Sequence, residues 1–271
     1  MKPPLRRPKL GQHFLSSAST CQRIAQSLAL APDDLVIEIG PGRGALTKLL
    51  ADRVERLAAI ELDAALVGIL RRAFESVPSV EIIEADILKT DLAEICRRLE
   101  KDSCIVFGNL PYYITSPVLH HLFGSQARIR RMALLVQKEV AERITAGPGS
   151  REYGYLSVLA QFYSSPRIAF VAPPGAFSPP PKVHSALVDF QMKFPSWDGK
   201  KDAVFLGFVQ MCFAQKRKNL LNNLGQAYTR PAVQQALESL DLGAHTRAEQ
   251  LGLEQLKELF EILASPSTAM C

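Results

Sequence analysis

Long apolar runs are missing from this sequence. Its richest apolar stretch, residues 57–70, is interrupted by Glu61 and Asp63, whereas a membrane-spanning helix needs about 20 mainly apolar residues. The first nine residues are basic and contain no apolar segment of the kind that a secretory signal requires. We therefore expect a cytoplasmic protein that does not enter a membrane.

Cysteine is scarce and is not arranged in pairs. The five cysteines are scattered, no C-x-x-C motif occurs, and no histidine lies at zinc-finger spacing from them. Structural zinc sites and disulfide-rich domains depend on such spacings. We therefore expect neither a disulfide framework nor a metal.

The composition is that of an ordinary globular protein. The 271 residues carry a formal net charge of +5, with 47% hydrophobic residues and a mean hydropathy of +0.04. Disorder requires lower hydrophobicity, and this length suits one large domain or a medium domain with an appendage. The modest positive charge is compatible with an anionic partner without establishing one.

Short β-branched runs alternate with helical stretches in the first half of the chain. The predicted strands cover residues 35–39, 57–60, 80–83, 105–107 and 132–136. Apolar residues recur at helical spacing in residues 45–53, 64–75 and 116–123. This alternation predicts an α/β fold with a doubly wound parallel sheet.

Two later β-branched runs, residues 168–171 and 186–190, predict a second β region. Between them lies a proline-rich segment, residues 173–181. Because proline fixes φ and donates no backbone N–H, we predict a rigid, irregular loop there.

The pattern changes again near residue 195. Residues 194–201 are polar and turn-rich. Three amphipathic helical stretches follow, at residues 202–222, 230–240 and 253–263. We predict an α/β domain over residues 1–194 and a small all-helical domain over residues 195–271.

A glycine-rich loop follows the first predicted strand. Gly40, Gly42 and Gly44 lie between that strand and the next helix, where glycine permits a tight turn and a close approach to a ligand. Gly40, Gly42 and Ala45 also satisfy the relaxed dinucleotide pattern G-x-G-x-x-G/A. The loop by itself therefore leaves the choice of cofactor open.

Acidic residues end the next two predicted strands. Glu61 lies about twenty positions after the loop, where a partner for a ribose diol is expected. Asp63 fits the N-cap of the following helix better. Asp86 is a candidate acceptor for the amino group of an adenine, although loops after strands are often acidic for solubility alone.

The segment Asn109-Leu-Pro-Tyr112 closes the fourth predicted strand and resembles the catalytic motif of amino-group methyltransferases that use S-adenosylmethionine. An exocyclic amine is a poor nucleophile because its lone pair is delocalised into the ring. The Asn109 side-chain oxygen and the Leu110 carbonyl would accept its N–H groups and favour a pyramidal nitrogen. Pro111 fixes the turn, and Tyr112 is placed to stack on the base.

Several separated segments together resemble the small-subunit ribosomal RNA adenine N6-dimethyltransferase family. They are residues 9–15, 38–44, 60–63, 84–86, 108–112, 137–143, 177–183 and 214–219. The resemblance covers almost the whole chain. It implies a Rossmann-like class I methyltransferase sheet, and transfer of two methyl groups from S-adenosylmethionine to N6 of each of two adjacent adenines near the 3′ end of 16S rRNA. It also implies a role in small-subunit biogenesis, with the small ribosomal subunit or its precursor as partner and a monomeric enzyme that needs no metal.

The resemblance also implies site residues. By motif match, the cofactor contacts fall on His13, Leu15, Gly40, Gly42, Glu61, Asp86 and Asn109. Many relatives have Asn at the position of His13, so a hydrogen bond made there is either replaced by imidazole or lost. Phe177 resembles a position that presses on the target base, but a core aromatic is an equally good interpretation.

An adenine inside a helix cannot reach such a pocket, so the target base must be unpaired or flipped out. Candidate RNA contacts form three basic clusters: Lys2, Arg6, Arg7 and Lys9; Arg128, Arg130 and Arg131; and Lys216, Arg217 and Lys218 on the first helix of the C-terminal domain. For each cluster, a solvated helix face is the competing interpretation.

Three alternatives stay open at this point. One is a 23S rRNA adenine N6-methyltransferase of the resistance type, which shares the fold. Another is a ribosome assembly or RNA-binding factor that no longer catalyses. A nicotinamide-dependent dehydrogenase is the most remote. The intact Asn109-Leu-Pro-Tyr112 segment argues against the second.

Overall fold

The computed structural model describes residues 13–111, 114–125, 128–193, 197 and 199–264. Contacts divide the chain into two compact units, residues 1–141 with 166–192 and residues 142–165 with 193–271. The sequence predicts a single boundary near residue 195. The two divisions differ in residues 142–165, which the contacts group with the C-terminal helices because the helix in this segment packs against them.

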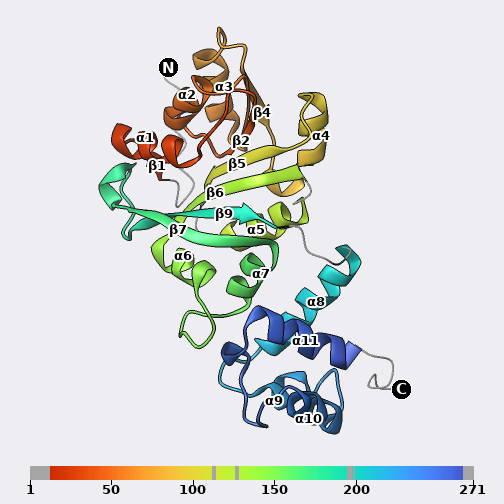
Figure 1. The fold of residues 1–271 in the computed structure, drawn as a ribbon. Helices are drawn as coiled ribbons and strands as arrows, with labels where there is room; N and C mark the ends of the chain where they lie inside the picture. The colour runs from red at the N-terminus through yellow and green to blue at the C-terminus, as the bar shows by residue number, and fades with distance from the viewer. Residues whose placement is uncertain (1–12, 112–113, 126–127, 194–196, 198, 265–271) are drawn as a thin grey trace. The chain divides into compact units, whose positions relative to one another are not determined.

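A seven-stranded sheet forms the centre of the first unit (Figure 1). Its strands, in spatial order, are β4 (Val80–Glu84), β3 (Arg56–Glu61), β2 (Leu35–Ile39), β5 (Cys104–Asn109), β6 (Ile129–Gln137), β9 (Ser185–Met192) and β7 (Ser164–Ala172). The first five are parallel neighbours, and β9 is antiparallel to β6. The predicted doubly wound sheet is confirmed, with one correction. The two late strands extend the same sheet instead of forming a second β region, because β9 pairs with β6 from Arg131 to Gln137 and β7 lies next to β9.

Four helices connect the parallel strands: α2 (Ala45–Ala51), α3 (Ala64–Ala73), α4 (Leu92–Arg98) and α5 (Thr115–Gly124), with the 3₁₀ turn η1 (Ile87–Lys89) before α4. The helix α1 (Ala18–Ser27) precedes β2, and α6 (Lys138–Thr145) follows β6. The predicted N-cap Asp63 is confirmed, since its side chain accepts a hydrogen bond of 2.9 Å from the Ala65 N–H.

One face of the sheet is covered by α1 and α2. Alternate strand residues such as Val36, Leu57 and Phe107 are buried there with Ile24 of α1 and Leu46 of α2. On the other face, Phe123 of α5 makes an edge-to-face contact with Phe190 of β9. Both faces are therefore apolar, as the continuous apolar runs of the parallel strands require.

A second, two-stranded sheet joins the N-terminal segment to the proline-rich loop. β1 (Phe14–Leu15) pairs antiparallel with β8 (Phe177–Ser178), which follows the 3₁₀ turn η4 (Pro174–Ala176). The backbone N–H groups of Ser16 and Ser17 both donate to the Ala176 carbonyl. The predicted irregular loop is thus irregular only in part, because a short strand lies within it.

The second unit is helical in its described part. Its elements are α7 (Tyr155–Tyr163), α8 (Gly199–Cys212), α9 (Leu220–Leu224), α10 (Arg230–Ser239), the turn η5 (Ala248–Gln250) and α11 (Leu253–Ala264). Aromatic rings form its core, where Phe205 contacts Phe162, Trp197 and Phe260. No helix within the described ranges is both long and apolar enough for a membrane span.

The predicted helix over residues 202–222 is wrong in its second half. α8 ends at Cys212, and α9 begins at Leu220 after Asn219, whose side chain caps the new helix by accepting from the Asn222 N–H. Lys216, Arg217 and Lys218 lie in the turn between the two helices. Helical periodicity continued across the gap because the apolar spacing resumes in α9.

Candidate active site

The strand order reverses between β2 and β5, and this is where the predicted chemistry gathers. The chain passes from β2 to β3 on one side, whereas β5 pairs with the other side of β2. In open α/β sheets, ligands bind outside the carboxyl ends of the strands at such a switch point. Gly40 follows β2 there, and Asn109 ends β5.

The glycine-rich loop forms the tight turn that its sequence predicts. Gly40, Gly42 and Gly44 have φ angles of +68°, +60° and +79°, a region that side chains with a Cβ rarely adopt. A Cβ atom at Gly42 would lie 2.6 Å from the Phe14 ring. Glycine is therefore required at Gly42 both for the turn and for the close approach of β1.

Glu61 is held by backbone N–H groups at the end of β3. Its Oε1 accepts from Leu62 and Asp63 at 2.9 and 3.0 Å, and its Oε2 accepts from Gly42 at 3.3 Å. Burial raises the pKa of Glu61, while these three donors lower it. An ionised carboxylate offers about four acceptor positions, so Oε2 retains capacity for a ligand hydroxyl.

Asp86 lies at the end of the adjacent strand and caps η1. Its Oδ1 accepts from the Leu88 N–H at 3.0 Å, and its main-chain oxygen accepts from the Thr90 hydroxyl at 2.8 Å. These two bonds fix the turn after β4. Asp86 lines the same cavity as Glu61, at the end of a turn with a fixed backbone.

Asn109 is oriented by the N-terminal segment. Its Nδ2 donates to the His13 main-chain oxygen at 2.9 Å. Because that carbonyl can only accept, the amide is oriented with Nδ2 toward His13, and Oδ1 is left as an acceptor. The Leu110 N–H donates to the Leu135 carbonyl of β6 at 3.2 Å, which fixes the turn after β5.

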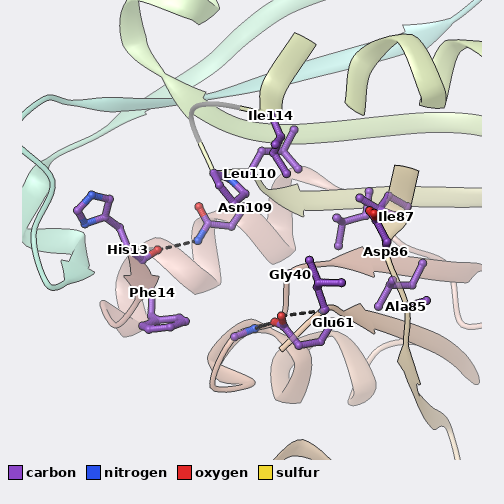
Figure 2. A pocket seen from close by; sticks show the side chains of 15 residues that line it. His13, Phe14, Gly40, Glu61, Ala85, Asp86, Ile87, Asn109, Leu110 and Ile114 are labelled. Atoms are coloured by element: carbon purple, nitrogen blue, oxygen red, sulfur yellow. Dashed lines mark hydrogen bonds between the residues drawn. The ribbon is translucent and has the colours of Figure 1, made fainter. Parts of the chain in front are cut away.

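These side chains surround one cavity (Figure 2). The predicted site residues that line it are His13, Gly40, Gly42, Glu61, Asp86, Asn109, Leu110 and Pro111. Apolar side chains such as Ile39, Ile60 and Ile87 complete its walls. A mostly apolar pocket with a few fixed polar groups is the usual form of a small-molecule site.

Other predicted site residues lie elsewhere. Leu15 faces a smaller cavity behind the glycine-rich loop, and Phe177 is only 4% exposed and packs in the core cluster with Leu15. This placement of Phe177 agrees with the core-aromatic interpretation. Tyr112 lies outside the described residues, as do Arg6 and Arg7.

The side chain of His13 faces away from the cavity. Its Nδ1 is 2.8 Å from the Pro179 carbonyl of the proline-rich loop, and Figure 2 shows the ring on the side opposite Asn109. His13 nevertheless lines the cavity, and its main-chain oxygen accepts a hydrogen bond from the Asn109 side chain.

Phe14 and Glu38 also lie at this site, and neither has a role predicted from the sequence. Phe14 packs against Gly42. The Arg43 guanidinium carbon lies over the Phe14 ring, 5.3 Å from the centroid of that ring. Glu38 is 2% exposed within β2, and its Oε2 has no hydrogen-bond partner among the described residues. Burial and, to a lesser extent, the nearby Glu61 carboxylate raise the pKa of Glu38 to about 7. The Thr47 hydroxyl lowers this pKa, but by less than burial raises it. The sequence contains a signal for the buried Glu38, because this residue is the one carboxylate in the otherwise apolar run of residues 35–39.

The basic clusters divide into engaged and exposed groups. The Arg131 guanidinium donates to Asp189 and to the carbonyls of Ser27 and Leu28, and Arg130 pairs with Asp34. That cluster is therefore largely structural. Lys216, Arg217 and Lys218 are exposed, although the Lys216 ammonium donates to the Arg151 carbonyl.

Metal ligands do not gather anywhere in the described part of the chain. No three His, Cys, Asp or Glu side chains are placed there to hold an ion.

Comparison with known proteins shows the family to which the chain belongs. Residues 5–265 match the family described as ribosomal RNA adenine dimethylase. A ribosomal RNA small subunit methyltransferase A from Acidobacterium capsulatum is 47% identical, with 96% of this chain and 92% of that protein covered. The protein of the same name from Koribacter versatilis is 41% identical, with 96% and 95% covered.

Solved structures agree on the fold. The 23S rRNA methyltransferase ErmE matches with a TM-score of 0.72 and 28% identity, covering 92% of this chain and 99% of that one. A dimethyladenosine transferase from Plasmodium falciparum matches with a TM-score of 0.79 and 23% identity over 96% and 100%. The second likeness extends over nearly the whole of both chains and concerns the fold alone.

Proposed function

Because this chain belongs to the ribosomal RNA adenine dimethylase family, and is therefore an rRNA adenine dimethyltransferase that uses S-adenosylmethionine, we propose that its target is 16S rRNA. The reaction that we propose places two methyl groups on N6 of each of two adjacent adenines near the 3′ end of that RNA. The observation that carries the proposal is Asn109, fixed with its side-chain oxygen available at the cavity between β2 and β5.

The residues around the cavity fit S-adenosylmethionine. In our proposal, the Glu61 carboxylate accepts the ribose hydroxyls through Oε2, Asp86 accepts from the adenine amino group, and Gly40 and Gly42 allow the close approach of the amino-acid portion. Leu15 supports this loop from behind. When bound, the cofactor supplies an electrophilic methyl group.

Asn109 and Leu110 act on the methyl acceptor. The Asn109 Oδ1 and the Leu110 carbonyl accept the two N6–H groups of the target adenine and orient the nitrogen lone pair. Because positioning and electrostatics supply most of the acceleration in this proposal, we assign no carboxylate or histidine as a general base. Pro111 holds the turn that carries both acceptors.

The target base must leave its stack to reach these acceptors. Tyr112 remains our proposal for the stacking partner. Phe177 remains the second one only if the proline-rich loop rearranges, since its ring is buried in the core. For the RNA backbone we propose the basic N-terminal arm with Arg6 and Arg7, and the exposed turn with Lys216, Arg217 and Lys218.

Small-subunit specificity is supported by the names of the relatives, which are 47% and 41% identical. We further propose that the enzyme acts as a cytoplasmic monomer on the small subunit or its precursor during assembly. The second candidate function is methylation of the large subunit, and the observation in its favour is the structural likeness to a 23S rRNA methyltransferase.

Labelled S-adenosylmethionine tests the choice. Unmethylated small subunits and large subunits are incubated separately with the enzyme, and the modified bases are mapped. Label on adjacent adenines of 16S rRNA is expected. Label confined to 23S rRNA would establish the alternative, and the absence of label on both, with intact cofactor binding, would indicate a factor without catalysis.

A further inference from the structure

The main chain and the side chain of His13 form hydrogen bonds with two distant segments. Its main-chain oxygen accepts from the Asn109 amide at 2.9 Å, and its Nδ1 lies 2.8 Å from the Pro179 carbonyl. Asn109 ends β5, whereas Pro179 lies in the proline-rich loop. One residue thus connects the proposed amine-binding group to a segment 70 positions further along the chain, both within the first unit.

The protonation of the ring follows from its partner. A carbonyl oxygen can only accept a hydrogen bond, so Nδ1 must carry a proton and donate. A neutral imidazole with the proton on Nδ1 and a protonated imidazolium both satisfy this requirement. The bond therefore depends on a donor at one position of the side chain and does not require a charge.

Backbone contacts support the same connection. β1 pairs with β8 through Phe14 with Ser178 and Leu15 with Phe177, and the Ala176 carbonyl accepts from Ser16 and Ser17. The His13 bond extends this ladder by one further link on the side nearest Asn109. A two-residue strand pair is marginal by itself, so an added side-chain bond has a measurable share in holding the loop.

We propose that the His13 side chain is a positioning residue for the methyl acceptor, and not a cofactor contact. It fixes the proline-rich loop relative to Asn109 and so defines the space in which the target adenine is held. This inference rests on the proposed function, since it assigns His13 to the base side of the same site. The interpretation it replaces is the one from the sequence, in which the imidazole contacts the cofactor.

Replacements of His13 separate the two roles by geometry. The Nδ2 of an asparagine is attached to Cγ, as Nδ1 of histidine is, so His13→Asn retains a donor at the required position. The amide nitrogen of His13→Gln lies one bond further out, and His13→Leu has no donor. His184, which is exposed and follows the same loop, provides the matched control His184→Leu.

Three measurements on these variants test the proposal, and two of them need no RNA. The first is hydrogen exchange of the amides of residues 176–178 in the full-length protein, and the second is the dissociation constant of S-adenosylmethionine by calorimetry. For His13→Leu and His13→Gln we expect exchange about five- to tenfold faster, which matches the loss of one exposed hydrogen bond. We expect the cofactor dissociation constant to stay within about twofold, and His13→Asn to restore slow exchange.

The third measurement is initial rates with unmethylated small subunits. His13→Leu should raise KM for the subunits several-fold more than it lowers kcat, and His13→Asn should recover the KM. His184→Leu should change none of the three quantities. If His13→Leu does not fold, the comparison of His13→Gln with His13→Asn replaces it.

A tenfold weaker cofactor affinity with unchanged exchange at residues 176–178 would overturn the proposal in favour of a cofactor contact. Unchanged exchange together with unchanged cofactor affinity would also overturn it. If the wild-type enzyme does not methylate small subunits, the proposed function fails, but exchange and cofactor binding still decide the role of His13.

Discussion

Acidic side chains in two regions of one sheet have different partners. At the carboxyl ends of the parallel strands, Glu61 is held by three backbone N–H groups. At the antiparallel end, Asp189 of β9 is 2% exposed and is held by two arginine side chains. Its Oδ1 accepts from the Arg131 Nε at 2.6 Å, and its Oδ2 accepts from Arg167 at 2.8 and 2.9 Å.

The difference separates binding from structure. Backbone donors orient the Glu61 carboxylate without neutralising it, so it retains charge and acceptor capacity for a ligand. The two guanidinium groups neutralise Asp189, and Arg131 in turn donates to the last carbonyls of α1. Changes in the first region should therefore affect binding and rate, and changes in the second should affect stability.

The largest expected effect is on rate, at Asn109. Asn109→Ala removes an acceptor that acts on the developing charge of the amine, so methyl transfer should fall by at least about 10²–10³-fold. Incorporation of labelled methyl groups into small subunits measures it. Circular dichroism and cofactor calorimetry should show a folded variant that still binds, and Asn222→Ala on an exposed position of α9 is the control. Near-normal turnover at saturating cofactor would remove Asn109 from the mechanism.

The second effect is on stability, at Asp189. Asp189→Ala leaves Arg131, which is 20% exposed, without its carboxylate, and breaking such a pair should lower the free energy of unfolding by about 3 kcal/mol. Urea unfolding measures the loss, with the exposed Asp33→Ala as control. At temperatures where the variant is folded, cofactor affinity should change little. A variant that keeps its stability but binds the cofactor weakly would contradict the assignment of Asp189 to stability alone.

The third effect concerns cofactor affinity at Glu61. Glu61→Gln removes the charge and turns one acceptor into a donor that faces backbone N–H groups. Because hydrogen bonds to charged groups contribute about 1.5–3 kcal/mol, affinity for S-adenosylmethionine should fall by roughly 10- to 100-fold in calorimetry. Glu84→Gln is the matched control, since Glu84 is opposite Glu61 in the register of β4 but is exposed and outside the cavity. Equal losses in both variants would point to net charge instead of a specific contact.

Glu38 is buried inside β2 and forms no ion pair with a described residue, so unlike the ligand-facing Glu61 it should make stability depend on pH. Its pKa is about 7 in the folded chain and 4.5 when exposed. Between these values the unfolded chain releases a proton that the folded chain keeps, so stability should fall as pH rises from about 4.5 to about 7 and then level off. Glu38→Gln should flatten this slope and raise the free energy of unfolding at pH 8, by at most about 3 kcal/mol.

Urea unfolding of Glu38→Gln between pH 4.5 and 8 tests this, with Glu84→Gln as a control that should keep the wild-type slope. An unchanged slope in Glu38→Gln would mean that Glu38 is ionised in the folded chain.

The smallest effect lies outside the sheet. Replacing Lys216, Arg217 and Lys218 together with Ala should weaken binding to 16S rRNA several-fold at physiological salt and reduce the slope of log affinity against log salt by up to about 3. Filter binding across a salt series measures it. Arg71→Ala with Arg72→Ala, on an exposed face of α3, is the control. An unchanged slope would exclude the turn from the RNA footprint.

Periodicity was enough to predict most of the sheet. The β-branched runs at residues 35–39, 57–60 and 80–83 are strands, because neighbouring parallel strands bury both faces and so carry continuous apolar runs. Periodicity could not locate the end of α8, since Asn219 starts a new helix with the same apolar spacing. It also gave no prediction of α1 or α7.

The candidate cavity was predictable in outline. Glycines after β2 and polar residues after β3, β4 and β5 must meet at one edge of a parallel sheet, and the structure brings Gly40, Glu61, Asp86 and Asn109 together there. Phe14 was not predictable as a wall, because nothing local indicates that a two-residue strand returns to pack on Gly42.

The sequence by itself determined which groups this protein has for chemistry and in what order along the chain they occur. Only the tertiary structure decided the partner of each one. Asn109 is 96 positions from His13, His13 is 166 from Pro179, and Arg131 is 58 from Asp189. A hydrogen bond or ion pair acts over about 3 Å, so its partner is set by the packing that brings distant segments together, and no local pattern of residues encodes it.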